Sequence, residues 1–161
     1  MDWLHTLFLQ LSLSLFCLAA LSSPLDRRDS VFAIANLSAK ALPLSHRVEY
    51  FFLAKPGPAD ADMVQCSTLV TGLNESLCSV PLTACEGGGL SFEWRQFDND
   101  GAELRVVRNL SSLDPPLVEA GGHRIGGDEI AVLAAGTQFR HQAYVGPNNF
   151  SMPMTALAGV D

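Results

Sequence analysis

Three cysteines, at positions 66, 78 and 85, lie in the stretch CSTLVTGLNESLCSVPLTAC. Their spacing lacks the Cys-x2-Cys pairs of a zinc site, and no histidine nearby in the sequence could activate a thiol. In an oxidising compartment a disulfide is therefore expected. Cys66 with Cys85 is the favoured pair because both flank predicted strands. Pairing of Cys78 with either of them stays open.

The favoured pairing closes a loop whose constraint is worth about 3 kcal/mol in the chain-entropy description. It leaves Cys78 as a free thiol among turn residues and beside a sequon. Such a thiol is either buried and inert or paired with a second copy of the chain, so a homodimer is one expected state.

The histidines do not complete a catalytic site. His46 is expected at the surface where a strand begins, His123 in a solvated loop within AGGHRIGGDE, and His141 on a strand whose register leaves its direction open. A hydrolase using His123 with Asp128 or Glu129 would need a nucleophile that the sequence does not offer. We therefore expect no catalytic residue, no enzyme activity and no cofactor.

The stretch QFDNDG has the acidic character of a calcium loop but not its spacing. An EF-hand would require an acidic residue at Gln96 and a glutamate at Val107. Residues 98–101 are better interpreted as a hairpin turn in which Asn, Asp and Gly adopt positive φ. We expect no metal site.

The N-terminal residues are typical of a secreted protein. Residues 1–23 contain an apolar run from Leu7 to Leu21, shorter than the roughly 20 residues that span a bilayer, and end in small residues like a signal peptide. Residues 24–28 would form a short pro-segment that ends at the dibasic pair Arg27–Arg28. Residues 29–161 would then be a single secreted domain.

Four Asn-x-Ser sequons fit this route and are candidate glycosylation sites on the surface: Asn36, Asn74, Asn109 and Asn149. The net charge of the chain is −7, and removal of residues 1–28 takes away two arginines and two aspartates, which leaves it unchanged. An acidic surface disfavours nucleic acid, and no basic amphipathic helix indicates a membrane surface. A protein, a carbohydrate or a small apolar molecule is the expected partner.

Most of residues 29–161 is predicted to form short strands, because apolar residues alternate at period two between turn residues. We expect an all-β fold, a compact antiparallel sandwich or barrel of about seven or eight strands. Residues 109–128, with two prolines and two Gly-Gly pairs, are expected to be a loop, and the tail from Asn148 carries no strong pattern. The predicted strands are 31–36, 46–54, 64–70, 90–97, 102–108, 129–134 and 138–145.

The segment SAKALPLSHRVEYFF, residues 38–52, resembles the Alternaria major allergen-like family of small secreted fungal proteins. The family pattern is Ser-Ala-x-Cys-x-Pro-His-Ser-x-x-Cys-x-Tyr-x-Phe. Ala41 and Val48 stand where its two cysteines would pair, and Leu44 replaces its histidine. The matching residues are Ser38, Ala39, Pro43, Ser45, Tyr50 and Phe52.

The resemblance extends through Cys66, Cys85 and the DGAEL turn, over about residues 31–108. It implies an extracellular β-sandwich or barrel without catalytic residues, of the effector or elicitor type. We therefore expect a secreted protein that binds a host protein in the plant apoplast and modulates immunity, with loops 55–62 and 109–128 carrying recognition. The alternative is a carbohydrate-binding, lectin-like protein of the cell wall, which would need exposed aromatic side chains.

Overall fold

The computed structural model describes residues 31–57, 62–73, 75–87, 89–98, 101–110, 117–135 and 139–157. Two predicted features, the signal peptide of residues 1–23 and the pro-segment 24–28 with Arg27 and Arg28, lie outside these residues, as does the sequon asparagine Asn74. No helix in the described ranges has both the length and the apolar character needed to cross a membrane.

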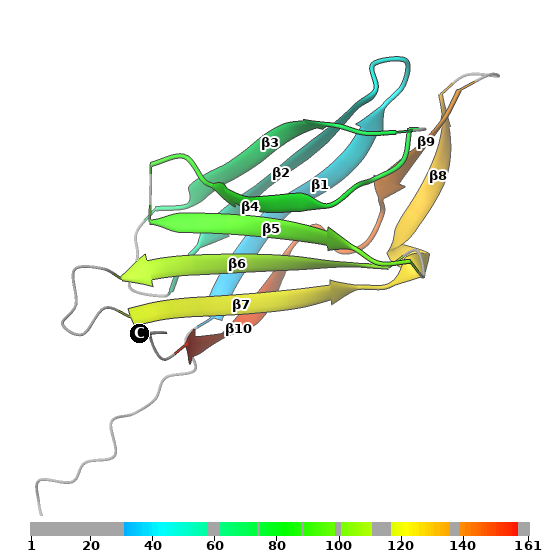
Figure 1. Ribbon diagram of the computed structural model, residues 1–161. Coiled ribbons are helices and arrows are strands. Elements are labelled where there is room, and N and C mark those ends of the chain that lie inside the picture. The colour runs from blue at the N-terminus through cyan, green and yellow to red at the C-terminus, as the bar shows by residue number, and fades with distance from the viewer. Residues whose placement is uncertain are drawn as a thin grey trace, which may run out of the picture.

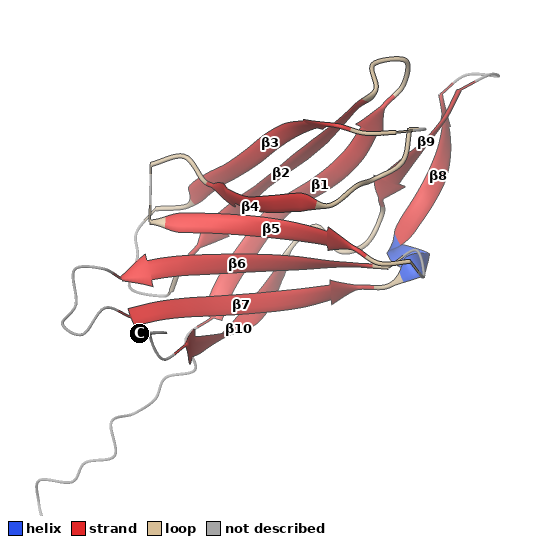
Figure 2. Cartoon of the chain, in the orientation of Figure 1, coloured by secondary structure: helices blue, strands red, loops and turns tan. Residues whose placement is uncertain are grey.

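The described residues form an all-β fold of ten strands and one short 3-10 helix (Figures 1 and 2). In chain order these are β1 (Val31–Leu42), β2 (Arg47–Lys55), β3 (Val64–Thr71), β4 (Val80–Ala84), β5 (Leu90–Gln96), β6 (Ala102–Leu110), β7 (Leu117–Ile125), η1 (Gly127–Glu129), β8 (Ile130–Ala135), β9 (Phe139–Tyr144) and β10 (Phe150–Leu157).

All strand pairs are antiparallel, and the main path through the sheet runs β3-β2-β1-β10-β7-β6-β5-β4. The hairpin β8–β9 lies off this path and joins it where Ala143 of β9 pairs with Lys40 of β1. The sheet curls until its two end strands, β3 and β4, lie next to each other (Figure 1). It is thus nearly closed into a barrel.

The Cys66–Cys85 disulfide joins the two ends of this sheet, as the sequence favoured. Cys66 lies in β3 and Cys85 directly follows β4, with their Cα atoms 4.3 Å apart. Beside it, Glu86 N–H donates to the Gln65 carbonyl at 2.8 Å, and Gln65 Nε2 donates to Glu86 Oε1 at 2.9 Å. The covalent bond and these hydrogen bonds hold the seam of the barrel at one end.

The core fills the inside of the curled sheet with aromatic rings at period two. In β2, Val48, Tyr50 and Phe52 are buried while their neighbours are not. The rings of Tyr50 and Trp94 are 5.3 Å apart, and those of Phe52 and Phe92 are 5.1 Å apart. Burial of each large apolar side chain contributes about 1.5–3 kcal/mol.

A bulge in β1 lets this strand change its neighbour. The register with β2 shifts between Ala35 and Ser38, and Asn36 has a φ of 57°. Before the bulge β1 pairs with β10, and beyond it with β9. Asn36 N–H donates to Asn149 Oδ1 at 3.1 Å and Leu37 N–H donates to the Asn148 carbonyl at 2.9 Å, which satisfies the two amides that leave the ladder.

All seven predicted strands are present, but three strands were not predicted: β4, β7 and β10. The prediction of a loop over 109–128 is wrong for residues 117–125, which form β7. Gly121 lies in the middle of β7, where an added Cβ would come within 2.9 Å of Phe32 Cδ2 and 3.0 Å of the Pro153 carbonyl oxygen. The glycine is thus required by close packing and does not mark a turn.

Candidate functional site

The structure places Cys78 in a partly buried position against strands β2 and β3. Its thiol is free and partly buried, and its Sγ lies 3.9 Å from the Thr71 carbonyl oxygen. Its backbone carbonyl accepts from Tyr50 Oη at 2.6 Å, and its N–H donates to the same oxygen at 3.1 Å. Burial raises the pKa of the Cys78 thiol above its ordinary value, which disfavours the thiolate needed of a nucleophile.

The structure places His46 in a turn and His123 on a strand. His46 is exposed, as expected, in the turn between β1 and β2. His123 is on strand β7 and not in a loop, and its ring stacks on Phe150 with centroids 4.0 Å apart. Within the described residues, no three His, Cys, Asp or Glu side chains gather in a way that could hold a metal ion.

The pairing of His123 with Asp128 or Glu129 has no support in the structure. Glu129 Oε2 accepts from Gly126 N–H at 2.8 Å and so stabilises the entry to η1. Its other carboxylate oxygen and the Tyr144 hydroxyl both lie beside Gly146. Burial, and after it the charge of Glu129, raises the pKa of Tyr144 to about 12. The acidic group therefore has a structural role.

Three of the four sequon asparagines lie within the described residues, and all three are exposed: Asn36, Asn109 and Asn149. Asn36 and Asn149 are in direct contact through the hydrogen bond at the β1 bulge. The side-chain amide of Asn149 also donates from Nδ2 to Asn148 Oδ1 at 2.9 Å. These positions are accessible, as glycosylation requires.

Backbone strain is concentrated at one end of the barrel. Leu44, His46 and Glu75 all have positive φ, at 64°, 52° and 56°. For residues other than glycine such a conformation costs about 1–3 kcal/mol and persists only where the surrounding structure enforces it. Two loops meet here, the β1–β2 turn of residues 43–46 and the segment that follows β3 from Gly72. We call these two loops the leucine end.

Hydrogen bonds between the two loops hold the leucine end in place. Leu44 N–H donates to Glu75 Oε1 at 3.2 Å, and Gly72 N–H donates to the His46 carbonyl at 2.9 Å. Within the turn, Ser45 Oγ donates to the Leu42 carbonyl at 2.9 Å. The strained residues are therefore fixed by contacts between loops that lie far apart in sequence.

The leucine end presents two large apolar side chains to solvent. Leu44 is 70% exposed and Leu73 is 78% exposed. Isolated exposed leucines are common on protein surfaces. These two differ because they extend from hydrogen-bonded loops, and because Leu44 is held there by a backbone conformation that leucine rarely adopts. Such rigid presentation reduces the entropy that would be lost on binding.

The hairpin β8–β9 is anchored to the same end of the molecule (Figure 1). Gln142 N–H of β9 donates to the Glu75 carbonyl at 2.9 Å, and Gln142 Oε1 accepts from Leu77 N–H at the same distance. The hairpin adds Val132, 60% exposed, and Leu133, 40% exposed. The hairpin that is anchored here thus also carries exposed aliphatic groups.

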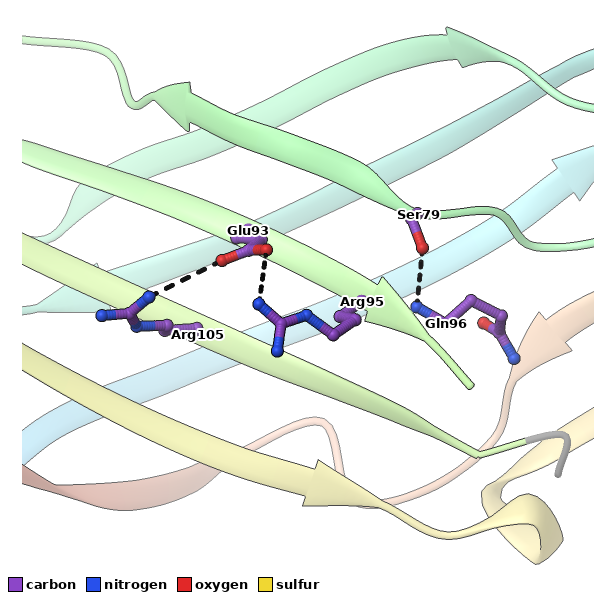
Figure 3. Close-up of polar contacts among 5 residues, drawn as sticks. All are labelled: Ser79, Glu93, Arg95, Gln96 and Arg105. Atoms are coloured by element: carbon purple, nitrogen blue, oxygen red, sulfur yellow. Dashed lines mark hydrogen bonds and ion pairs between the residues drawn. The ribbon is translucent and has the colours of Figure 1, made fainter. Parts of the chain in front are cut away.

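The outer wall of β5 and β6 has the opposite character (Figure 3). Glu93 Oε1 lies 3.1 Å from Arg95 Nη2, and Glu93 Oε2 lies 3.8 Å from Arg105 Nη1. Next to them, Gln96 N–H donates to Ser79 Oγ at 2.9 Å across the β4–β5 pair. Exposed ion pairs of this kind stabilise a fold by only about 0–1 kcal/mol. They make this wall polar, in contrast to the leucine end.

Sequence reasoning did not find the leucine end. In the sequence, Leu44 stands out only as the residue that replaces a histidine of the family pattern, and no sequence signal indicates that Leu44 or Glu75 adopts positive φ. Of the two loops expected to carry recognition, 55–62 is a loop at residues 56–57 and 62 of its described part. Of the described residues in 109–128, those from 117 to 125 form strand β7. No protein-family model matches the chain, and no curated protein matches it.

Proposed function

We propose that this protein is a secreted, non-catalytic binding protein of the fungal effector or elicitor type. It binds a host extracellular protein in the plant apoplast and modulates immunity. The observation that supports a binding role is the leucine end, where Leu44 and Leu73 are held exposed on mutually hydrogen-bonded loops. Apolar groups at the centre of a patch, fixed before binding, are typical anchors for a protein partner.

A protein partner is favoured over a cell-wall carbohydrate by the kind of side chain that is exposed. Sugar rings stack on aromatic faces, but none of the large apolar side chains that are exposed in the described ranges is aromatic. Trp94, the tryptophan that a lectin would need at its surface, is buried in the barrel. The disulfide across the seam fits the oxidising extracellular compartment.

The test is co-purification of the tagged, secreted protein from host apoplastic fluid, followed by mass spectrometry. The variant Leu44→Asp/Leu73→Asp places charges at the centre of the proposed surface, and Leu82→Asp is the matched control because Leu82 is a 57% exposed leucine on β4. We expect a host protein to be retained by the wild type and by the control, and to be lost with the double variant.

Two results would contradict the proposal at different levels. Retention of the same host protein by the double variant would exclude the leucine end as the binding surface. Recovery of nothing above background with the wild type would count against the effector function itself. Binding of the wild type to chitin or glucan in a parallel pull-down would favour the carbohydrate alternative.

A further inference from the structure

Among the described residues, β3, β4 and β8 each end a path through the sheet, and β8 is the one that lies outside the seam. β3 and β4 end the main path, and β8 ends the branch through β9. Free edges invite pairing with other chains unless proline, a bulge, a charge or a covering segment prevents it. β4 contains Pro81 and a register shift between Val80 and Thr83, and the disulfide joins it to β3. The seam thus covers these two edges at the end that carries the disulfide.

The edge of β8 has none of these protections. Its sequence, IAVLAA, contains no charge, no proline and no polar side chain, and it pairs with β9 without a register shift. Val132 and Leu133 are neighbours in sequence and point to opposite faces of the hairpin, yet both are exposed. A strand that is apolar on both faces would be stabilised by a partner that continues the sheet.

The ladder shows which backbone groups are available. Val145 N–H donates to the Glu129 carbonyl at 2.8 Å, which identifies residues 129 and 145 as a hydrogen-bonded pair. Such pairs alternate along an antiparallel ladder, so Ile130, Val132 and Ala134 direct their N–H and C=O groups away from β9. The Ile130 N–H already donates to the Gly127 carbonyl of η1, so the Val132 and Ala134 N–H groups are the donors that this edge offers. In agreement, Gln142, opposite Val132, directs its own N–H away from β8 to the Glu75 carbonyl.

We propose that β8 pairs antiparallel with β8 of a second copy of this chain, with the two-fold axis at Val132. This register places the Val132 N–H and C=O opposite those of Val132 in the other copy. It also places the Ala134 N–H opposite the Ile130 carbonyl of the other copy, while the Ile130 N–H stays bonded to Gly127. The two ends of the strand are complementary in charge. Exposed Asp128 precedes β8, and exposed Arg140 of β9 pairs with Ala134 near its other end. In the antiparallel arrangement each copy therefore brings its acidic end toward the basic end of the other.

A second copy fits the edge better than an unrelated strand, because a two-fold contact requires a self-complementary patch. The chain carries a net charge of −7, so two copies repel each other wherever their charged walls meet. The uncharged strand β8 provides a contact without that repulsion. The dimer joins two barrels through one continuous sheet and leaves Leu44 and Leu73 outside the paired strands. The inference of this dimer does not rest on the proposed function.

The experiment measures the mass of the protein secreted from a eukaryotic host carrying the full chain, by sedimentation velocity over a wide range of concentration. Val132→Pro removes an outward N–H, and Val132→Lys places a charge at the axis. Leu82→Lys, on protected β4, is the matched control, and circular dichroism establishes that each variant is folded. We expect a concentration-dependent dimer in the wild type and the control, and its loss in both Val132 variants.

Three outcomes would contradict the proposal. A wild type that is monomeric throughout, or a dimer that survives Val132→Lys in a folded protein, overturns the β8 contact. The variant Cys78→Ser separates this dimer from one linked by a disulfide. The proposed dimer persists in Cys78→Ser, whereas loss of the dimer in that variant shows that Cys78 and not β8 joins the two copies.

Discussion

At the scale of single residues, Tyr50 is both a buried core residue and a hydrogen-bonding partner of the backbone. Its ring packs on Trp94, while its hydroxyl both donates to the Cys78 carbonyl and accepts from the Cys78 N–H. One side chain of β2 thereby satisfies both backbone groups of a residue in the segment that leads into β4. These two hydrogen bonds lie at the end of the seam away from the disulfide, where β3 and β4 diverge.

We predict that Tyr50→Phe lowers the free energy of unfolding by about 1–3 kcal/mol, because it leaves two backbone groups of Cys78 without their partner. Tyr144→Phe is the control, since the Tyr144 hydroxyl donates only one bond that the structure defines, to the Pro147 carbonyl at 2.8 Å. Urea unfolding of the three proteins measures the difference. A smaller loss for Tyr50→Phe than for Tyr144→Phe would contradict this role.

At the scale of elements, β7 depends on a pair of adjacent glycines with different surroundings. A Cβ on Gly121 would meet Phe32 and the backbone of Pro153, whereas one on Gly122 would meet only the Glu103 side chain, at 3.2 Å from its Oε1. Gly121 faces the packed interior and Gly122 faces the mobile end of a surface carboxylate. The two positions provide a test of close packing within one dipeptide.

Gly121→Ala is expected to destabilise the protein by about 1–3 kcal/mol, because Phe32 and the β10 backbone must move to admit a methyl group. Gly122→Ala should change stability by no more than about 0.5 kcal/mol, as surface substitutions usually do. Thermal and urea unfolding of both variants provide the comparison. Equal effects at the two positions would show that the contact with Phe32 does not limit the packing.

The disulfide acts on two elements that share no regular ladder. Replacing both Cys66 and Cys85 by alanine should lower stability by about 3 kcal/mol. Hydrogen exchange should then increase in β3 and β4 while the β6–β7 ladder, far from the seam, keeps its protection. Cys78→Ala is the control, with exchange close to that of the wild type. A uniform increase over all strands would argue against a local role at the seam.

At the scale of the whole molecule, two buried tyrosines are expected to lower the free energy of unfolding at alkaline pH. Burial raises the pKa of Tyr50 above the ordinary value of about 10, and burial followed by Glu129 raises that of Tyr144 to about 12. The folded protein thus retains protons that the unfolded chain loses. The resulting stability is present below about pH 10 and is lost as pH rises through the folded-state pKa values.

We therefore expect the free energy of unfolding to decrease between about pH 10 and 12, with a smaller slope in the double variant Tyr50→Phe/Tyr144→Phe. Urea unfolding at a series of alkaline pH values gives the slope. Lysine and arginine deprotonation affects both proteins alike, so the difference isolates the tyrosines. An unchanged slope in the double variant would refute the assignment.

Much of the fold was predictable because alternation is a local signal. The strand containing Val48, Tyr50 and Phe52 was found to within one residue at each end, and the pairing of Cys66 with Cys85 followed from cysteines that flank strands. β4 and β10 contain Pro81 and Pro153, and β7 contains Gly121, all of which are typical of turns. Their strand conformation is imposed by neighbours that are distant in sequence. The leucine end depends likewise on Glu75 meeting Leu44, a contact that no local pattern encodes.

The position of the disulfide in the sequence also has a consequence for the order of the folding steps. Cys66 and Cys85 are separated by only 19 residues, while the pairing of β1 with β10 joins the first described strand to the last. Short loops close faster and at lower entropic cost than long ones. A nascent chain that still lacks β10 already contains both cysteines of the native pair. Oxidation is therefore expected to precede the meeting of β1 and β10, which leaves that long-range pairing as the slow step of folding.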